Sequence, residues 1–227
     1  MTLEHVGIVF EVIAFLFAVS LHESAYAWMA NRCGDPTARM LGRITLNPIK
    51  HIDLFGTIIL PLVSVLAHFP VLGWAKPTPV DPRNFKNPVL DDILTSVIGP
   101  ISNFFVAGCS LVILIAIKFA SPMGAAIVSG LPSGMVPVQS SSFLVPVCFF
   151  VYEMLIINVV LAVFNLIPVP PLDGSHVLRH FLPESARRTY DMVGWIALLA
   201  LVYLGGNLLG RLIFPVLGFF DSILLRV

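Results

Sequence analysis

The stretch SLHESAYAW, residues 20–28, places His22 and Glu23 inside an otherwise apolar run. Residues 6–30 around it are long enough for a transmembrane helix, which needs about 20 residues. The two side chains lie roughly 12 Å before the end of this helix at 1.5 Å per residue. Ionisable groups inside a membrane span are costly and usually belong to a functional site. His22 and Glu23 are therefore the first candidate site residues.

The composition predicts an integral membrane protein. Of 227 residues, 57% are hydrophobic and only 11% are charged, and the mean hydropathy is +0.93, whereas soluble domains carry about 25% charged residues. We therefore expect a lipid bilayer around one domain formed by residues 1–227. The net charge is zero, which gives no basis for nucleic-acid binding. Three scattered cysteines without a C-x-x-C motif indicate neither a disulfide framework nor a zinc ribbon.

Long apolar stretches predict an all-α polytopic fold with five to six transmembrane helices. The four stretches are residues 6–30, 93–120, 143–167 and 192–225. The last is long enough for two helices that bend at Gly205-Gly206-Asn207, giving a C-terminal helical hairpin over about 191–227. The remaining core spans about residues 6–180.

The basic residues predict the orientation in the membrane. They follow the first and third long stretches and precede the second, whereas residues 121–142 contain neither Lys nor Arg. By the positive-inside rule, the N-terminus lies outside, and residues 31–92 and 168–190 face the cytoplasm.

Residues 54–72 are apolar but have basic residues at both ends. Pro61, Pro70 and Gly56 interrupt this stretch, so a re-entrant element covered by protein is the prediction and a sixth span the alternative. Before it, residues 43–52 predict a short strand at the cytoplasmic mouth of the site. The edge of that strand could pair with an unwound substrate.

A carboxylate is expected at the depth of His22. The third long stretch ends in NLIPVPPLDG, residues 165–174, with Asn165 near its end and Asp173 just beyond. In the predicted orientation, this helix and the first both run from outside to inside. His22 and Asp173 can therefore meet on the same side of the membrane.

Residue types and spacing indicate a variant of a zinc site. Residues four apart share a helix face, so His22 and Tyr26 point the same way, and a histidine at position 26 would complete H-E-x-x-H. Two such histidines with a carboxylate hold zinc and leave one position for water. A glutamate next to the first ligand can then take the proton of that water, which is the place of Glu23.

Five motifs together resemble the site-2 protease family of intramembrane zinc metalloproteases: HESAY, NPIKHID, GWAKPTPVDPRNF, GPISN and NLIPVPPLDG. The resemblance covers most of residues 15–180 and is to compact bacterial and archaeal members without a PDZ or CBS domain. It implies one Zn²⁺ at His22, position 26 and Asp173, with Glu23 as general base. Asn103 and Asn165 would be clamp or oxyanion groups near the scissile peptide. The implied substrates are transmembrane segments, cut towards the cytoplasmic side of the cell membrane.

Tyr26 departs from the family pattern and leaves three readings open. Because a phenol has a pKa near 10, it is a poor zinc ligand unless the metal helps to ionise it. Tyr26 coordinates as phenolate, or zinc binds weakly through His22, Asp173 and water, or the chain is a non-catalytic relative that binds membrane partners. His176 could replace the missing ligand, against the simpler reading of a polar residue at the membrane surface.

The predicted function is a zinc-dependent intramembrane endopeptidase. The alternative is a catalytically impaired or metal-free relative that binds membrane proteins. A transporter that uses His22, Glu23 and Asp173 as an ion path would be favoured by internal repeats with paired broken helices, and the sequence shows none.

Overall fold

The computed structural model describes residues 3–60, 63, 73–135 and 142–227, and the side chains from residue 7 onward. Within these ranges the chain forms helices and turns and no strand. The α-helices are α1 Leu3–Cys33, α2 Thr37–Met40, α4 Pro88–Ala120, α5 Pro122–Gly130, α6 Leu144–Asn165, α7 Asp173–Phe181, α8 Glu184–Leu204 and α9 Gly206–Arg226. Shorter turns of helix are η1 Pro48–Lys50, η2 Leu54–Ile59, η3 Pro82–Asn84 and η4 Leu131–Ser133.

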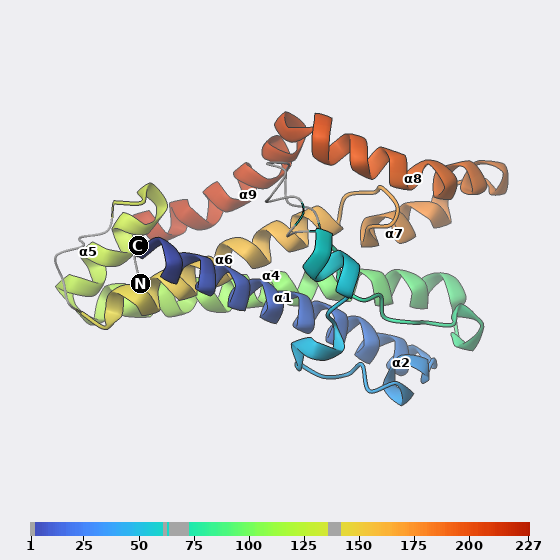
Figure 1. Ribbon diagram of the computed structural model, residues 1–227, viewed down its shortest axis with the longest axis horizontal. Helices are drawn as coiled ribbons and strands as arrows, with labels where there is room; N and C mark the ends of the chain where they lie inside the picture. Colours follow the sequence, from blue (N-terminus) through green and yellow to red (C-terminus); the bar gives the residue numbers. More distant parts are fainter. Residues whose placement is uncertain (1–2, 61–62, 64–72, 136–141) are drawn as a thin grey trace.

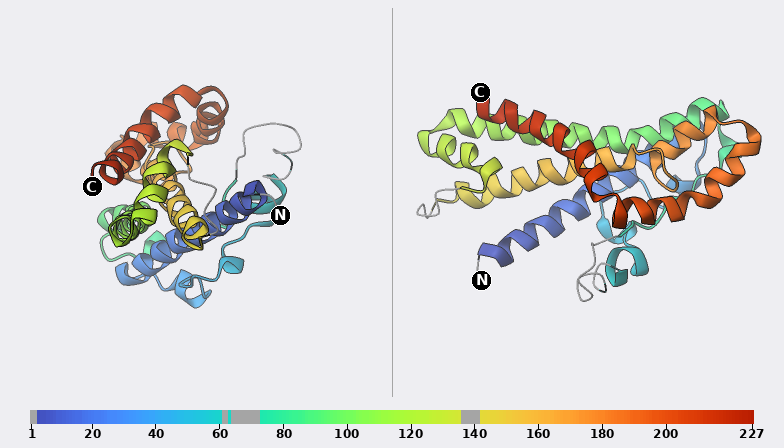
Figure 2. Two further views of the ribbon diagram at one scale, coloured as in Figure 1. Left: turned by 90° about the vertical axis from the view of Figure 1, so that its left-hand side faces the viewer. Right: turned by 90° about the horizontal axis from the view of Figure 1, so that it is seen from above.

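Three long helices, α1, α4 and α6, form the centre of the molecule and run along its long axis (Figure 1). The helix α4 runs antiparallel to α1 and α6, so that the C-terminal ends of α1 and α6 lie at the same end as the start of α4 (Figure 2). These three and α9 are long and apolar enough to cross a membrane. The arrangement brings the end of α1 and the segment after α6 together, which places the candidate site.

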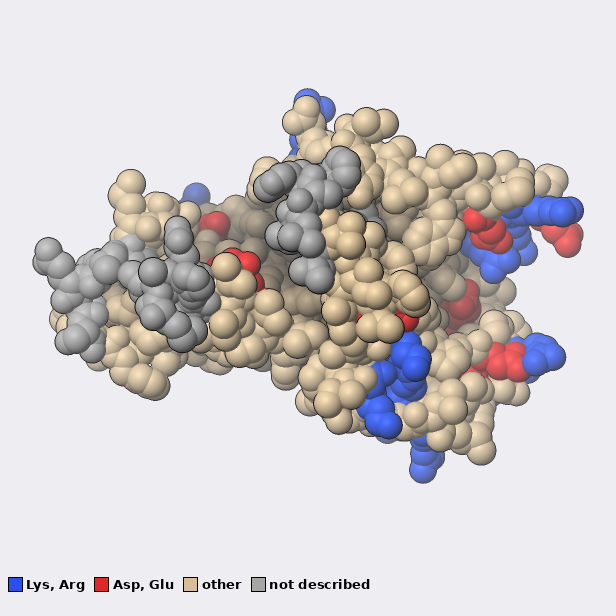
Figure 3. Space-filling model, viewed as in Figure 1, with Lys and Arg blue, Asp and Glu red and all other residues tan. Residues whose placement is uncertain are grey.

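The outer surface of the central helices is apolar. On α1 the exposed side chains include Ile8, Val12, Ile13 and Phe17, a pattern that suits contact with lipid tails. In Figure 3, most Lys and Arg side chains in view gather over the half that holds α2, α7 and the start of α8. The basic end of the molecule is thus the end that carries His22 and Asp173.

The main apolar core lies at the other end of the molecule. There α4, α5, α6 and α9 bury side chains such as Leu114, Ile127 and Leu155 against one another. Two polar contacts attach α9 to this core: Tyr152 Oη donates to Asp221 Oδ1 at 3.0 Å, and Lys118 Nζ donates to the carbonyl of Leu224 at 2.7 Å. The site is therefore built away from the best-packed part of the chain.

The predicted strand over residues 43–52 is wrong. This segment forms turns and the 3-10 helix η1, because Pro48 has no N–H for a ladder and the Asn47 side chain caps the helix by accepting from Ile49 N. Side chains close the loop on itself: Arg43 donates to the carbonyl of Lys50, and His51 Nε2 lies 2.8 Å from the carbonyl of Thr45. No free strand edge is available here for a substrate.

Only part of the predicted re-entrant element over residues 54–72 can be compared. Residues 54–59 form η2, a short π-helix that begins where the Asp53 side chain accepts from Phe55 N and Gly56 N. Apart from residues 60 and 63, the rest of the stretch lies outside the described residues. The prediction of a re-entrant path therefore stays a prediction.

The bend in the last apolar stretch is where it was predicted, since α8 ends at Leu204 and α9 begins at Gly206. The two helices do not fold back into a hairpin, however. In Figures 1 and 2 both run in the same general direction and meet at an open angle. The reason is that each packs on a different part of the bundle: Leu198 of α8 lies against Ile167 and Leu172, and Leu224 of α9 against the main core.

A buried aspartate holds the loop before α4 against the end of α1. Asp35 is fully buried and accepts hydrogen bonds from Thr37, from Asn84 Nδ2 and from the backbone N–H of Asp81. Burial alone would raise the pKa of Asp35, but these donors stabilise the carboxylate more and lower its pKa below the ordinary value. The contact fixes the course of the extended segment 73–81 past α1.

Candidate functional site

His22 and Asp173 meet at the basic end of the bundle, as the depth argument predicts. His22 Nε2 lies 3.0 Å from Asp173 Oδ2, and both side chains are largely buried, with 9% and 15% of their surface exposed. Among the described residues, no hydrogen-bond donor is aligned with Asp173 Oδ2. His22 Nε2 faces this buried carboxylate oxygen at ion-pair distance.

Gly174 allows Asp173 to reach this place. The helix α7 starts at Asp173 directly against the end of α6. A Cβ added at position 174 would lie 2.2 Å from the carbonyl oxygen of Leu166 and 2.8 Å from that of Ile167. Because only glycine permits such an approach, the L-D-G turn keeps the start of α7, and with it Asp173, close to α6.

The other ring nitrogen of His22 is bonded to a chain of buried amides. His22 Nδ1 lies 2.8 Å from Asn103 Oδ1. Asn103 Nδ2 donates to Asn158 Oδ1 at 2.8 Å and to the carbonyl of Ala18 at 3.2 Å. Asn158 Nδ2 donates to the carbonyl of Met154 at 2.8 Å. Both asparagines are fully buried, so this chain links α1, α4 and α6 inside the bundle.

Gly99 makes room for the His22 ring. A Cβ at this position would lie 2.5 Å from both Cε1 and Nε2 of the imidazole. Gly99 is one turn before Asn103 on α4, so the same helix face supplies the space for the ring and the acceptor for its Nδ1. The GPISN motif is thus a cradle for His22.

Glu23 is half-buried and is held from the side of the extended segment. Thr78 Oγ1 donates to Glu23 Oε2 at 2.6 Å. Since Asp35 anchors the following residues of that segment, the position of Glu23 depends on the loop before α4. Glu23 stands next to the first candidate ligand.

The residues fit a zinc site only in part. Two tetrahedral ligands about 2.0–2.2 Å from one zinc ion lie roughly 3.3 Å apart, close to the separation of His22 Nε2 and Asp173 Oδ2. Tyr26 follows one turn later on α1, and its electrostatic partners include Asp173 and Glu23. In the described part of the chain, no three His, Cys, Asp or Glu side chains are placed to share a metal. The third protein ligand would have to be the Tyr26 oxygen.

His176 contacts an aspartate of α4 and belongs to a second cluster of polar side chains. His176 Nδ1 lies 3.4 Å from Asp92 Oδ1, and His180 Nε2 lies 2.8 Å from Asp92 Oδ2. The hydrogen bond to Asp92 raises the pKa of His176 above its ordinary value, although burial opposes this. These contacts attach α7 to α4. The structure thus favours the simpler reading of His176 over a replacement ligand.

Asn165 and Asn103 differ in their surroundings. Asn165 Nδ2 donates to the carbonyl of Leu161 within α6, whereas the described partners of His22 are Asn103 and Asp173. Asn103 has both N–H groups engaged inside the bundle. Their assignment as clamp or oxyanion groups stays a prediction for Asn165, whereas the bonds of Asn103 point to a different task.

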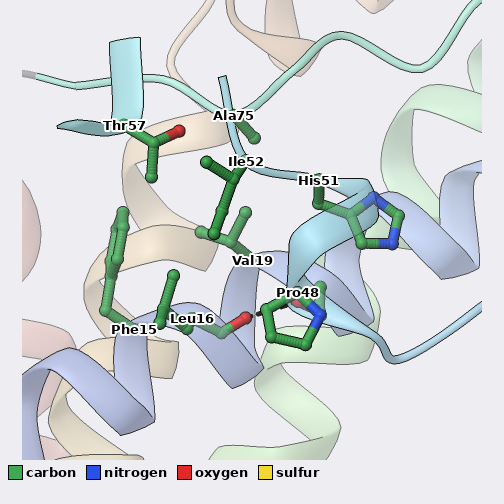
Figure 4. Close-up of a pocket in the computed structure, with 9 residues that line it drawn as sticks. Phe15, Leu16, Val19, Pro48, His51, Ile52, Thr57 and Ala75 are labelled. Atoms are coloured by element: carbon green, nitrogen blue, oxygen red, sulfur yellow. Dashed lines mark hydrogen bonds between the residues drawn. The ribbon is translucent and has the colours of Figure 1, made fainter. Parts of the chain in front are cut away.

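Two hollows near α1 lie apart from these residues. The smaller is a space of about 10 Å³ that offers room for about one water; Figure 4 shows Phe15, Leu16 and Ile52 around it and the His51 ring directed away from them. The larger is an apolar groove of about 410 Å³ lined by Leu21, Trp28 and Phe105 among others. Neither is lined by His22, Glu23 or Asp173.

Sequence reasoning missed three residues of the site. Asn158 lies seven residues before Asn165 in an apolar run, and an isolated polar residue within a span was the available signal. Thr78 lies in the GWAKPTPVDPRNF motif and Gly99 in the GPISN motif. A single sequence does not show which side chains these residues contact. All three become visible only through contacts between distant segments.

Comparison with known proteins agrees with this geometry. Residues 10–204 match the profile of peptidase family M50. The chain is 37% identical over 177 residues to a Bacillus subtilis protein named "Putative zinc metalloprotease YwhC", covering 78% of this chain and 70% of the relative. It is 30% identical over 223 residues to "Putative zinc metalloprotease Rip2" of Mycolicibacterium smegmatis, covering 96% and 76%. No solved structure matches significantly. The chain belongs to peptidase family M50, the site-2 protease family.

Proposed function

We propose that the protein is a zinc-dependent endopeptidase that cuts transmembrane segments of other membrane proteins. The observation that carries this proposal is the pairing of His22 Nε2 with Asp173 Oδ2, 151 positions apart in the chain and next to Glu23, where α1, a helix of spanning length, meets the start of α7. Buried ionisable groups at the end of a membrane-spanning helix are typical of functional sites. Membership in family M50 and the names of both relatives support the same chemistry.

Each residue has a distinct task in this mechanism. His22 Nε2, Asp173 Oδ2 and the Tyr26 oxygen would hold the zinc, which supplies an acidified water and polarises the substrate carbonyl. Glu23 accepts the proton from the attacking water and delivers it to the leaving amine nitrogen. Thr78 Oγ1 keeps the Glu23 carboxylate in place while its other oxygen moves the proton. Gly99 and Asn103 hold the His22 ring.

The substrate must lose helical structure before it is cut. Hydrogen bonds within a helix and the side chains around them shield each peptide bond from attack. The site lies near one end of the spanning helices, where a substrate helix can fray towards water. We propose that this end faces the cytoplasm of a bacterial or archaeal cell, since Lys and Arg gather there (Figure 3).

A metal-free protein that binds membrane helices is the second candidate. The observation that favours it is Tyr26, which stands where the resemblance implies a histidine. A neutral phenol binds zinc poorly, and His22 with Asp173 alone gives a two-residue site. In this case the architecture would grip a transmembrane partner without cutting it.

Zinc content and cleavage together separate the two candidates. Purified unaltered protein is compared with His22→Ala, Glu23→Gln and Tyr26→His for zinc per chain and for cleavage of a panel of single-span membrane proteins. The protease proposal expects about one zinc per chain that His22→Ala removes, and cleavage that Glu23→Gln abolishes while zinc remains. If only Tyr26→His binds zinc, the protease proposal fails for this chain and the binding function is supported.

A further inference from the structure

We propose that Asn103 and Asn158 are positioning residues that fix the tautomer of His22, with the proton on Nδ1 and the lone pair on Nε2. This inference rests on the proposed function for its consequence, zinc binding, but its geometry stands independently. Two backbone carbonyls, which only accept hydrogen bonds, fix the orientation of both amides.

The first anchor is the carbonyl of Met154. It accepts from the Asn158 side chain at 2.8 Å, so the atom that faces it must be the amide nitrogen. The oxygen of Asn158 therefore faces Asn103. Asn158 is fully buried, and reversing its amide would place an oxygen against the Met154 oxygen.

The second anchor is the carbonyl of Ala18. Asn103 faces two acceptors on one side, Ala18 O at 3.2 Å and Asn158 Oδ1 at 2.8 Å. Only an NH₂ group satisfies both, because it has two hydrogens. The oxygen of Asn103 must then point to His22, and since this oxygen only accepts, the ring nitrogen at 2.8 Å must carry a hydrogen.

The consequence for His22 is a fixed orientation of its lone pair. With Nδ1 protonated, a neutral imidazole has its lone pair on Nε2, the atom that faces Asp173. Gly99 packs against the same edge of the ring and leaves no space for a side chain there. Partners of this kind set both the ring orientation and its basicity as a metal ligand.

The same bonds give Asn103 a task other than stabilising an oxyanion. Both of its N–H groups point to protein acceptors and away from the space near Asp173. The geometry thus assigns Asn103 to the histidine and leaves oxyanion stabilisation to other groups. Asn158 acts through Asn103 and has no direct contact with the ring.

Nuclear magnetic resonance of labelled histidine tests the tautomer directly. The six histidines are labelled with ¹⁵N and ¹³C in metal-free Asp173→Ala protein, in which no carboxylate draws a proton to Nε2, at a pH where the imidazole is neutral. The His22 signals are assigned by their loss when His22→Ala is added. The expected result is a protonated Nδ1 and an unprotonated Nε2. A proton on Nε2, or rapid exchange between the two tautomers, would overturn the proposal.

Variants of Asn103 and Asn158 test this chain of hydrogen bonds through zinc binding. Asn103→Leu should weaken zinc affinity by about 10- to 100-fold, and Asn158→Leu by a smaller factor. Asn103→Asp keeps an acceptor for Nδ1 and should retain the Nδ1–H tautomer that Asn103→Leu loses. Ser96→Ala is the matched control, because Ser96 is a buried polar residue of α4 whose hydroxyl bonds only within its own helix, to Asp92 O.

The outcomes separate this inference from the proposed function. If Asn103→Leu folds, keeps the tautomer and binds zinc as the unaltered chain does, the proposed role of the two asparagines is wrong. This holds whether or not the protein is a protease. If the unaltered chain binds no zinc, the protease proposal fails. The tautomer measured without metal still decides whether the two asparagines fix the His22 ring. A loss of the Nδ1–H signal in Asn158→Leu as well as in Asn103→Leu supports the full chain of bonds.

Discussion

Two histidine clusters lie at the same end of the bundle and both depend on α4, yet they are built differently. His22 is buried, and its partner on α4 is the neutral amide of Asn103. His176 and His180 are partly exposed, and their partner on α4 is the carboxylate of Asp92. In the first cluster the two ring nitrogens of one histidine contact an amide and a carboxylate, those of Asn103 and Asp173, whereas in the second cluster two histidines share one carboxylate.

The difference shows how surroundings decide what a histidine does. A hydrogen bond to a neutral amide fixes the orientation of the ring through Nδ1. The other nitrogen, Nε2, can then bind a ligand. In the second cluster the Asp92 carboxylate raises the pKa of His176 and holds α7 against α4.

Glu23→Gln should have the largest effect. Loss of the proton acceptor is expected to lower the cleavage rate by about 10²- to 10⁴-fold, while zinc content stays unchanged because Glu23 is not a ligand. The measurement is the rate of cleavage of a membrane substrate in detergent. Ser24→Ala, the neighbour that lines the apolar groove, is the control. Retention of most of the activity in Glu23→Gln would contradict the assigned role.

Gly99→Ala should disturb the buried cluster next. The added Cβ would lie 2.5 Å from the His22 ring, so the ring must move away from Asn103 or Asp173. We expect zinc affinity to fall by about 10- to 100-fold, measured by competition with a chelator of known affinity. Gly108→Ala is a matched control, since a Cβ at this position on the same helix meets nothing within 4 Å. Equal zinc affinity in the two variants would contradict the assigned role of Gly99 in making room for the His22 ring.

Asp92→Asn should weaken the second cluster without touching the first. Replacing the carboxylate removes its charge from the contacts with His176 and His180, which we expect to cost about 1–2 kcal/mol of unfolding free energy for the α7–α4 contact. The readout is the unfolding of the purified protein in detergent, together with protease sensitivity around α7. A tenfold or larger change in zinc affinity would show that the two clusters are coupled after all.

The pH dependence of the second cluster should be the smallest effect. Because the pKa of His176 is raised in the folded protein, the protonated ring stabilises the fold below its unfolded pKa of about 6.5, and this contribution is lost as pH rises through the folded pKa. Since 38% of the His176 side chain is exposed, we expect less than about 1 kcal/mol. Stability of unaltered protein and His176→Gln, measured from about pH 6 to pH 8, should differ in slope; parallel curves would remove His176 as the cause.

Helix-level features were predictable because they follow from local chemistry. Runs of apolar residues predict spanning helices wherever the backbone must satisfy its own hydrogen bonds, and the predicted stretches 6–30, 93–120 and 143–167 correspond to α1, α4 and α6. The bend after Leu204 follows from two adjacent glycines. The strand over residues 43–52 was wrong because its alternating pattern was read without the loop contacts of Arg43 and His51.

The candidate residues, and the end of the bundle at which His22 and Asp173 meet, could be predicted from the sequence alone. His22, Glu23 and Asp173 stand out because ionisable groups are costly in lipid, and helix direction then sets their depth. Only the tertiary structure decided which partner each one has: Asn103 for His22, Thr78 for Glu23, Asp92 for His176. The physical reason is that hydrogen bonds act over about 3 Å, and the packing of distant helices decides which groups come that close.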